Sequence, residues 1–240
     1  MRRGPDEFVL RRPPLGAFLP TAHDVGREYK VLSALSDTSV RVPRATLFCE
    51  DESIIGAPFY LMEKIDGLVI RSELADSYAS AEERAAIGDE LVDALVELHA
   101  VDPASCGLSD FGRSSGYLER QLRRWTGQME LTLPLTRPLP DLEAIGKWLT
   151  EHLPESPSAT IVHGDYKLDN VVFSAEPLAR LLSILDWEMS TLGDPLADLG
   201  WMTSFWREAD DGDVGVFAEL NRVTTLPGFK RRQDLVDCYA

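Results

Sequence analysis

The segment IVHGDYKLDNVVF, residues 161–173, places one histidine, two acids, one lysine and one asparagine between two apolar runs. A solvated surface loop is one interpretation, because charged residues mostly contact water. A reactive site is the other interpretation. Asp165 follows a short run expected to be a buried strand, and a carboxylate there costs free energy unless it meets donors, a metal or a substrate.

A second acidic segment, ILDWEMSTLGDPLADLGW, spans residues 184–201. We expect Asp186 to end an apolar strand, where a rigid element can aim its carboxylate. Two carboxylates and an amide on adjacent loops suit Mg²⁺, which completes its shell with phosphate oxygens and water. Glu188 follows on a segment expected to be extended, so its side chain should point to the same side. Contact with metal or substrate and simple solvation both remain open for Glu188.

Strand and helix patterns alternate in the first part of the chain. Apolar runs rich in aromatic and β-branched residues predict strands at 7–12 and 57–63, and a weaker strand is expected at 44–51. Between the first two, apolar residues recur at helical spacing in 21–36. Residues 1–65 are therefore expected to form a small unit of strands around one helix.

Helical patterns dominate the rest of the chain. Residues 80–103 begin with Ser80 and Glu83 in the register of a capping box and continue with an apolar helical face. Further helices are expected at 116–130 and 141–153. Short buried strands are expected around the polar segments, at 160–164, 170–174 and 181–187.

Length and charge narrow the classes of function. A chain of 240 residues suits one large domain or two small lobes. The net charge of −16 would repel nucleic acid and anionic lipid, so neither is an expected partner. No apolar run approaches the roughly 20 residues that cross a bilayer, and no secretory signal is visible, so we expect a cytoplasmic protein. Three widely spaced cysteines are expected to be reduced.

The order of the polar residues resembles a known superfamily. His163-x-Asp165-x-Lys167-x-x-Asn170, followed by Asp186, is similar to the catalytic core of protein-kinase-like enzymes. The motifs HGD, LDWE and GDPLAD resemble the aminoglycoside phosphotransferase family. The segment 8–35 is similar to the branch that includes kinase-like domains fused to acyl-CoA dehydrogenases.

The resemblance covers nearly the whole chain and implies a fold. It implies an α+β, protein-kinase-like fold of two lobes. Residues 1–65 would be the small, β-rich, nucleotide-binding lobe. Residues 66–240 would be the larger helical lobe, which carries the catalytic residues and binds the acceptor.

The resemblance also assigns roles in the larger lobe. Asp165 would orient the acceptor hydroxyl, and Lys167 would face the transferred phosphoryl group unless it is simply solvated. Asn170 and Asp186 would bind the metal. Two supporting residues are implied as well: His163 and Asp198 would hold the catalytic loop rather than react.

In the small lobe, the resemblance implies a nucleotide site. Arg11 or Arg12 stands where kinases carry the lysine that binds the α- and β-phosphates, although Arg and Lys are not interchangeable. Glu28 would pair with that cation, unless it is an exposed helix charge. Backbone groups of Glu63 and Ile65 would meet the adenine edge.

The match departs from the family in two places. Kinases cover the phosphates with a glycine-rich hairpin. Residues 1–7 contain only one glycine, Gly4, so we expect this hairpin to be largely missing. We also expect the chain to be truncated at both ends. Gly164 replaces the arginine that protein kinases carry after the histidine, and no A-P-E sequence follows. A small-molecule kinase is therefore favoured over a protein kinase.

The expected function is a Mg²⁺-dependent phosphotransferase that moves the γ-phosphoryl group of ATP or GTP to a small hydroxylated molecule. An aminoglycoside and a hydroxyacyl compound are both open as the acceptor. Two other functions remain open: an inactive pseudokinase or nucleotide-binding module, and a metal-dependent phosphohydrolase. The oligomeric state does not follow from the sequence.

Overall fold

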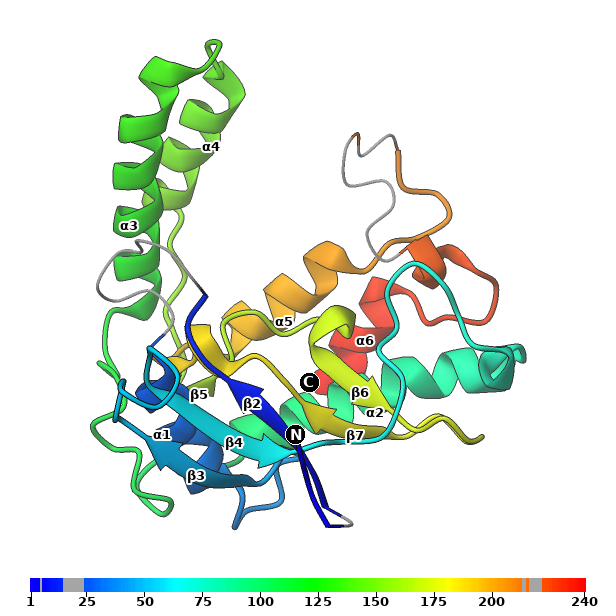
Figure 1. The fold of residues 1–240 in the computed structure, drawn as a ribbon. Coiled ribbons are helices and arrows are strands. Elements are labelled where there is room, and N and C mark those ends of the chain that lie inside the picture. Colours follow the sequence, from blue (N-terminus) through cyan, green and yellow to red (C-terminus); the bar gives the residue numbers. More distant parts are fainter. Residues whose placement is uncertain (5, 15–23, 213–214, 216–221) are drawn as a thin grey trace.

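The computed structural model describes residues 1–4, 6–14, 24–212, 215 and 222–240. A four-stranded sheet and one helix make a small lobe, and a larger lobe is mainly helical (Figure 1). The expected α+β fold of two lobes is confirmed.

The small lobe is an antiparallel sheet in the order β1-β2-β4-β3. The expected strands are present at nearly the expected bounds, and helix α1 covers the later part of the expected 21–36, of which 21–23 lie outside the described residues. The elements are β1 (Arg2–Arg3), β2 (Asp6–Arg11), α1 (Val25–Leu35), β3 (Ala45–Cys49) and β4 (Phe59–Glu63).

A short hairpin, β1 with β2, stands at the edge of this sheet. Gly4 lies at its turn with φ of 63°. This left-handed conformation is one that glycine adopts at no steric cost. Gly4 is the one glycine in residues 1–7.

Five α-helices form most of the described part of the larger lobe. Helices α3 and α4 lie side by side and project away from the two sheets of this lobe, while α5 runs across its middle (Figure 1). The helices are α2 (Ala81–His99), α3 (Tyr117–Thr132), α4 (Pro140–Glu151), α5 (Pro195–Phe205) and α6 (Arg232–Tyr239). The three helices expected between residues 80 and 153 are confirmed, whereas α6 was not expected from the sequence.

Two short antiparallel ribbons carry the polar segments. Strand β5 (Thr160–Val162) pairs with β8 (Thr191–Gly193), and β6 (Val171–Phe173) pairs with β7 (Leu181–Ile184). The three expected strands are present, and β8 is an addition. Among the described residues the chain forms 3₁₀ turns at Asp76–Tyr78, Leu133–Leu135, Leu168–Asn170, Trp187–Met189 and Arg222–Thr225.

Helix α2 begins with only half of the expected capping box. The Ser80 side chain accepts a hydrogen bond from the Glu83 N–H at 3.1 Å, as predicted. The Glu83 carboxylate instead accepts from the buried N–H of Ala179 at 2.7 Å. A buried N–H needs an acceptor, so Glu83 joins α2 to the loop between β6 and β7.

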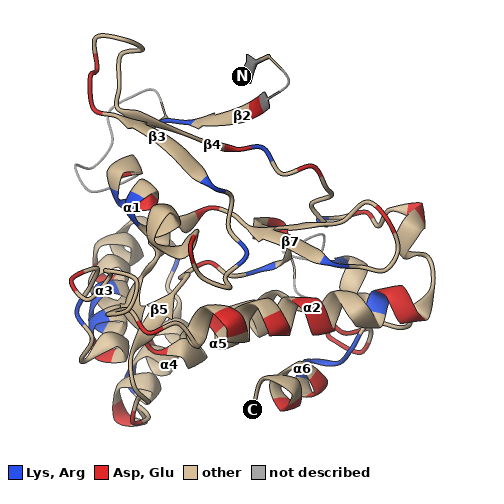
Figure 2. Cartoon of the chain, turned by 90° about the horizontal axis from the view of Figure 1, so that it is seen from below, with Lys and Arg blue, Asp and Glu red and all other residues tan. Residues whose placement is uncertain are grey.

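Arg41 links the two lobes. Asp and Glu residues recur along α2 (Figure 2), and two of them face this arginine. Arg41 donates to both carboxylate oxygens of Glu97, at 2.7 and 3.0 Å, and also binds Glu90. Its backbone carbonyl accepts from the Ile184 N–H at 2.7 Å. The segment between α1 and β3 is therefore fixed to both α2 and β7.

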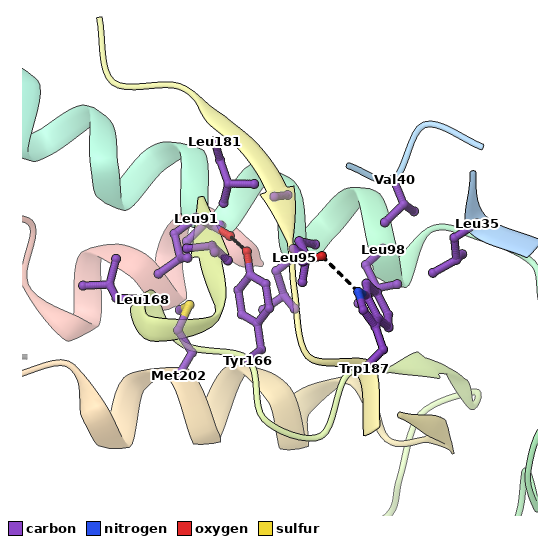
Figure 3. Close-up of a cluster of buried hydrophobic side chains, with 14 of the residues drawn as sticks. Leu35, Val40, Leu91, Leu95, Leu98, Tyr166, Leu168, Leu181, Trp187 and Met202 are labelled. Carbon is purple, nitrogen blue, oxygen red and sulfur yellow. Dashed lines mark hydrogen bonds between the residues drawn. The ribbon is translucent and has the colours of Figure 1, made fainter. Parts of the chain in front are cut away.

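The hydrophobic core holds the residue that follows Asp165. Tyr166 is fully buried between α2 and α5, and its hydroxyl donates to the Leu91 carbonyl at 2.7 Å (Figure 3). Trp187 is buried in the same core and donates to the Ile184 carbonyl at 3.0 Å. Both polar segments are thus anchored by aromatic side chains in the core.

No helix among the described residues is both long enough and apolar enough to cross a bilayer. All three cysteines have free thiols.

Candidate active site

Asp198 holds the start of the loop between β5 and β6. Its carboxylate accepts hydrogen bonds from the N–H groups of His163 and Gly164, at 2.6 and 2.8 Å. His99 of α2 contacts the same carboxylate at 3.2 Å. Asp198 is only 1% exposed, and hydrogen bonds to a buried charge are among the stronger ones in proteins. Asp198 therefore ties the loop to the first turn of α5.

His163 is a fully buried part of this support. Its Nε2 lies 2.9 Å from the Leu185 carbonyl and its Nδ1 lies 3.2 Å from the Asp165 N–H. These partners require a proton on Nε2 and a lone pair on Nδ1, which is the neutral imidazole. Burial lowers the pKa of His163, against the opposing charge of Asp198. His163 joins the Asp165 loop to the segment that carries Asp186.

Gly164 is required by the path of this loop. Its φ is 82°, a left-handed conformation that residues with side chains rarely adopt. A Cβ atom there would lie 2.7 Å from the Met189 carbonyl oxygen. The loop therefore packs so closely against residues 186–189 that no side chain fits at position 164.

Asp165 is surrounded by hydrogen-bond donors. Lys167 Nζ lies 2.8 and 2.9 Å from its two carboxylate oxygens. Asn170 Nδ2 donates to Oδ2 at 2.8 Å, and Trp201 Nε1 donates to Oδ1 at 2.7 Å. The Asp165 side chain is 19% exposed. These donors meet the cost of removing the carboxylate from water while leaving it within reach of a ligand.

Lys167 is therefore not simply a solvated lysine. Its side chain is 19% exposed and forms an ion pair with Asp165. Its ammonium also lies 5.2 Å from the centre of the Phe205 ring. The structure places Lys167 beside the candidate catalytic acid.

Asn170 and Asp186 come together through a backbone contact. The N–H of Leu185 donates to the Asn170 carbonyl at 2.8 Å, which brings the next residue, Asp186, alongside. The Asn170 amide nitrogen is occupied by the backbone and side chain of Asp165. Its amide oxygen is therefore the atom that Asn170 can offer to a cation.

Two local predictions around Asp186 were wrong. Strand β7 ends at Ile184, so Asp186 lies beyond the strand, with φ of 64°. The segment Trp187–Met189 is a 3₁₀ turn and not extended. Even so, Asp186 and Glu188 both reach the same nitrogen of Arg11, at 3.3 and 3.1 Å. The turn, rather than strand alternation, brings the two carboxylates to one side.

The oxygen donors at this site fit a Mg²⁺ ion that shares its shell with phosphate. Within the described part of the chain, no group of three or more His, Cys, Asp or Glu residues gathers as a metal site. Asn170, Asp186 and Glu188 offer an amide and two carboxylates. Mg²⁺ in nucleotide sites uses one or two carboxylates and takes the remaining oxygens from phosphate and water.

Arg11, and not Arg12, reaches Glu28. Arg11 Nε and Nη2 each lie 3.1 Å from a Glu28 oxygen. Arg12 Nε donates instead to the Pro13 carbonyl at 3.1 Å. Glu28 is 1% exposed and also accepts from the Tyr60 hydroxyl at 2.8 Å. The interpretation of Glu28 as an exposed helix charge is wrong.

The charges around Arg11 link the lobes. Burial alone would lower its pKa, but the hydrogen bond and charge of Glu28, with the charge of Asp186, raise the pKa of Arg11. The guanidinium extends from β2 of the small lobe to Asp186 and Glu188 of the large lobe. A fixed cation therefore stands between the lobes.

Glu63 and Ile65 lie where the small lobe ends. Glu63 is the last residue of β4, and its N–H donates to the Arg44 carbonyl at 2.9 Å. The N–H of Lys64 points to the Glu7 carbonyl at 3.4 Å. The Glu63 N–H is therefore hydrogen-bonded within the small lobe. The Glu63 carbonyl is the backbone group of this residue that could accept a hydrogen bond from a ligand.

The sequence reasoning missed Trp201. Asp194 caps α5 and Pro195 is its first residue, which places Asp198 in the first turn and Trp201 one turn later. Residues three apart lie on neighbouring positions of a helix. The spacing from Asp198 to Trp201 was therefore the available signal that Trp201 faces the same loop.

The fold of this chain is kinase-like. The sequence matches the phosphotransferase enzyme family over residues 2–229. The chain belongs to that family.

Sequence relatives include proteins named for a different activity. The chain is 40% identical over 207 residues to rat acyl-CoA dehydrogenase family member 11, covering 86% of this chain and 26% of that protein. It is 40% identical over 195 residues to mouse acyl-CoA dehydrogenase family member 10, covering 81% of this chain and 18% of that protein. The chain thus spans about a quarter or less of the length of these relatives.

Solved structures share the fold. A Ralstonia eutropha JMP134 protein, crystallised as a candidate aminoglycoside phosphotransferase, has a TM-score of 0.77 and 35% identity, covering 97% of this chain and 67% of that one. The streptomycin–ATP complex of the phosphotransferase APH(2")-IIa has a TM-score of 0.59 and 18% identity, covering 97% and 70%. At that identity the second likeness shows the fold alone.

Proposed function

We propose that this protein transfers the γ-phosphoryl group of ATP or GTP to a hydroxyl of a small molecule. The observation that carries the proposal is the meeting of Asp165, Asn170 and Asp186 on neighbouring loops. Hydrogen bonds of 2.8 Å join Asp165 to Asn170 and Asn170 to the residue before Asp186. Arg11 of the small lobe forms an ion pair with Asp186.

Asp165 orients the acceptor in this proposal. The acceptor hydroxyl donates to a carboxylate oxygen of Asp165 while its oxygen attacks the γ-phosphorus. The bond from that phosphorus to the β–γ bridging oxygen breaks, the nucleoside diphosphate leaves, and the hydroxyl proton passes to Asp165. Lys167 is held by Asp165 and offers positive charge to the transferred group.

Asn170 and Asp186 are the proposed metal ligands, with Glu188 beside them. A bound Mg²⁺ ion supplies neutralisation of the phosphate charge. His163 and Asp198 do not touch the substrates in this proposal, because both are buried and hold the loop backbone.

The small lobe, which we place at residues 1–65, would bind the nucleotide. Arg11 contacts phosphate oxygens, and the buried Glu28 carboxylate fixes the direction of its guanidinium. An arginine can bind phosphate with two parallel hydrogen bonds. The Glu63 carbonyl and the backbone of Ile65 would meet the adenine edge.

The comparisons support two candidate acceptor classes. Proteins of the same fold were solved with gentamicin and with streptomycin, which are aminoglycosides. Relatives at 40% identity carry the name of acyl-CoA dehydrogenases, which makes a hydroxyacyl compound the other class. A small hydroxylated acceptor covers both.

The proposal is tested by nucleotide binding and product formation in the wild type and Asp186→Ala. We expect Mg²⁺-dependent ATP binding and ADP formation in the wild type, and loss of the Mg²⁺ dependence in the variant. Asp237→Ala, on the exposed side of α6, is a matched control that should behave as wild type. Unchanged Mg²⁺-dependent nucleotide affinity in Asp186→Ala would contradict the metal assignment.

A nucleotide-binding module without turnover is the second candidate. The observation that favours it is that the β1–β2 hairpin has a single glycine, Gly4, in residues 1–7. A hairpin with few glycines would bring its backbone N–H groups less closely to the phosphates. Nucleotide binding with no ADP formation would favour this candidate, and ADP formation without any acceptor would favour a phosphohydrolase.

A further inference from the structure

We infer that Arg11 couples metal binding to nucleotide binding. Its guanidinium holds the carboxylates of Asp186 and Glu188 until phosphate oxygens take over its hydrogen bonds. The metal therefore binds weakly by itself and more tightly together with a nucleotide. This inference rests on the metal ligands of the proposed function and adds to them the order in which metal and nucleotide bind.

One nitrogen of Arg11 is shared between the two lobes. Nη2 lies 3.1 Å from a Glu28 oxygen, 3.3 Å from Asp186 Oδ1 and 3.1 Å from Glu188 Oε2. This nitrogen carries two of the five N–H donors of a guanidinium. Three acceptors thus compete for two donors, so the contacts with Asp186 and Glu188 can be exchanged for contacts with another acceptor.

Glu28 holds the other edge of the guanidinium. Arg11 Nε lies 3.1 Å from a Glu28 oxygen, and the Glu28 side chain is 1% exposed. The side chains of Asp186 and Glu188 are 40% and 28% exposed. Ion pairs in contact with water contribute little net free energy, whereas breaking a buried pair is costly. A ligand that competes for Arg11 therefore breaks its bonds to the large lobe first, while Glu28 keeps the guanidinium at the site.

Arg11 and a metal ion compete for the same oxygen atoms. Mg²⁺ binds carboxylate oxygens directly, and Asp186 Oδ1 and Glu188 Oε2 already face the positive charge of Arg11. Like charges at such short range repel each other. Metal binding without a nucleotide therefore requires either displacement of Arg11 or two cations side by side.

A nucleotide removes this competition. Its phosphate oxygens accept hydrogen bonds from Arg11, since an arginine binds phosphate with two parallel bonds. Asp186 and Glu188 are then released to the metal. The carboxylates of Glu28, Asp186 and Glu188 outnumber the one guanidinium, so these four side chains carry a net charge of −2, which a divalent cation offsets.

Binding of Mn²⁺ in the absence of nucleotide tests the coupling. Mn²⁺ prefers oxygen ligands as Mg²⁺ does, and electron paramagnetic resonance measures its free concentration. We expect Arg11→Met to bind Mn²⁺ at least about tenfold more tightly than the wild type. Adding Asp186→Ala to Arg11→Met should abolish the gain. Arg12→Met removes the same charge from a side chain that donates to the Pro13 carbonyl, so it is the matched control and should bind like the wild type.

A double variant guards against misfolding of Arg11→Met. Arg11→Met with Glu28→Gln replaces the buried carboxylate that would lose its arginine. This protein should still bind Mn²⁺ at least about threefold more tightly than the wild type. A merely structural role of Arg11 would instead weaken the binding of both Mn²⁺ and nucleotide.

Thermodynamic linkage gives a second readout. A coupling between two ligands is reciprocal, so Mn²⁺ should raise the affinity for a non-hydrolysable ATP analogue by a larger factor in the wild type than in Arg11→Met. Calorimetry with and without Mn²⁺ measures both factors, after correction for metal bound by the free analogue. Equal factors in the two proteins would contradict the coupling.

The Mn²⁺ titrations overturn the inference in three cases. They are equal or weaker Mn²⁺ binding by folded Arg11→Met and by the double variant, a similar gain in Arg12→Met, and a gain that survives Asp186→Ala. Because these readouts are equilibrium binding, they decide the coupling even when no phosphoryl transfer occurs. Failure of the proposed function is recognised separately, by the absence of ADP formation.

Discussion

Arg11 of β2 and Glu28 of α1 form a two-point ion pair, with Nε and Nη2 each 3.1 Å from a carboxylate oxygen. The acid is buried and the guanidinium is 34% exposed. The same guanidinium reaches Asp186 and Glu188 in the other lobe. One arginine thus connects the only helix described in the small lobe with the candidate metal ligands.

Replacement of Arg11 by methionine should reduce both stability and nucleotide affinity. The variant leaves the Glu28 carboxylate buried with the Tyr60 hydroxyl as its remaining described partner, so the free energy of unfolding should fall by about 1–3 kcal/mol. Nucleotide affinity should fall by about tenfold or more, because a phosphate contact is lost. Urea unfolding and calorimetry measure the two effects.

A double variant separates these effects. Arg11→Met with Glu28→Gln removes the unpaired charge, so it should regain part of the stability but none of the nucleotide affinity. Arg12→Met should change stability by less than about 0.5 kcal/mol, since Arg12 contacts only the neighbouring Pro13 carbonyl in the described hydrogen bonds. A larger loss of nucleotide affinity in Arg12→Met than in Arg11→Met would assign the phosphate contact to Arg12.

Gly164→Ala should destabilise the catalytic loop. The positive φ and the 2.7 Å approach to the Met189 carbonyl together predict a loss of about 1–3 kcal/mol in unfolding free energy. Gly127→Ala in α3 is the control, because a Cβ there meets nothing within 4 Å and alanine favours a helix. Thermal unfolding of both variants checks this, and a Gly164→Ala protein as stable as wild type would refute the loop geometry.

His163 should make stability depend on pH. Its folded pKa lies below the ordinary 6.5 because the ring is buried. As pH falls through 6.5, the unfolded chain takes up a proton that the folded chain does not, so this contribution to stability is present above 6.5 and is lost towards lower pH. One proton changes the unfolding free energy by at most about 1.4 kcal/mol per pH unit.

His163→Gln removes this proton while retaining a side chain that can donate and accept hydrogen bonds. Urea unfolding between about pH 7.5 and about pH 5.5 should show a steeper fall in stability for the wild type than for the variant. Parallel curves would mean that His163 is protonated equally in the folded and unfolded states.

The order of motifs in the sequence was enough to predict the central cluster. His163, Asp165 and Asn170 lie on one short loop, so their proximity is largely local. The approach of Asp186 was implied by the resemblance to protein-kinase-like enzymes, in which a metal-binding acid follows this loop. These residues could be predicted because their relations depend on sequence order.

Other relations depended on three-dimensional packing. The sequence did not separate Arg11 from Arg12, because that choice depends on the register in which Arg11 pairs with Tyr60 of β4. The left-handed conformation of Asp186 contradicts the usual preference of residues with side chains. The backbone leaves the extended conformation before Glu188, which lies in the 3₁₀ turn Trp187–Met189. Strand alternation could therefore not predict the direction of the Glu188 side chain.

Long-range partners were also beyond the sequence patterns. Glu83 was expected to complete a local cap, but the N–H of Ala179 supplied a partner 96 residues away. Arg41 and Trp201 have no motif of their own, and each acts through contacts with distant segments. A single sequence contains no local signal for such contacts.

Asp165→Asn provides the most direct test of phosphoryl transfer. Asparagine retains one oxygen for the surrounding donors but cannot take the acceptor proton, so fold and nucleotide affinity should persist while kcat falls by about 10²–10⁴-fold. Asp169→Asn is the matched control. Asp169 lies on the same loop, and burial, partly offset by the charge of Lys167, raises its pKa, but it has no role in the proposed transfer.

The decisive measurement is acceptor-dependent ADP formation by Asp165→Asn, on preparations whose melting temperature and ATP affinity match the wild type. We predict a loss of at least about a hundredfold in kcat for Asp165→Asn and near wild-type turnover for Asp169→Asn. Full turnover in a well-folded Asp165→Asn protein would contradict the assignment of Asp165 as the residue that receives the acceptor proton.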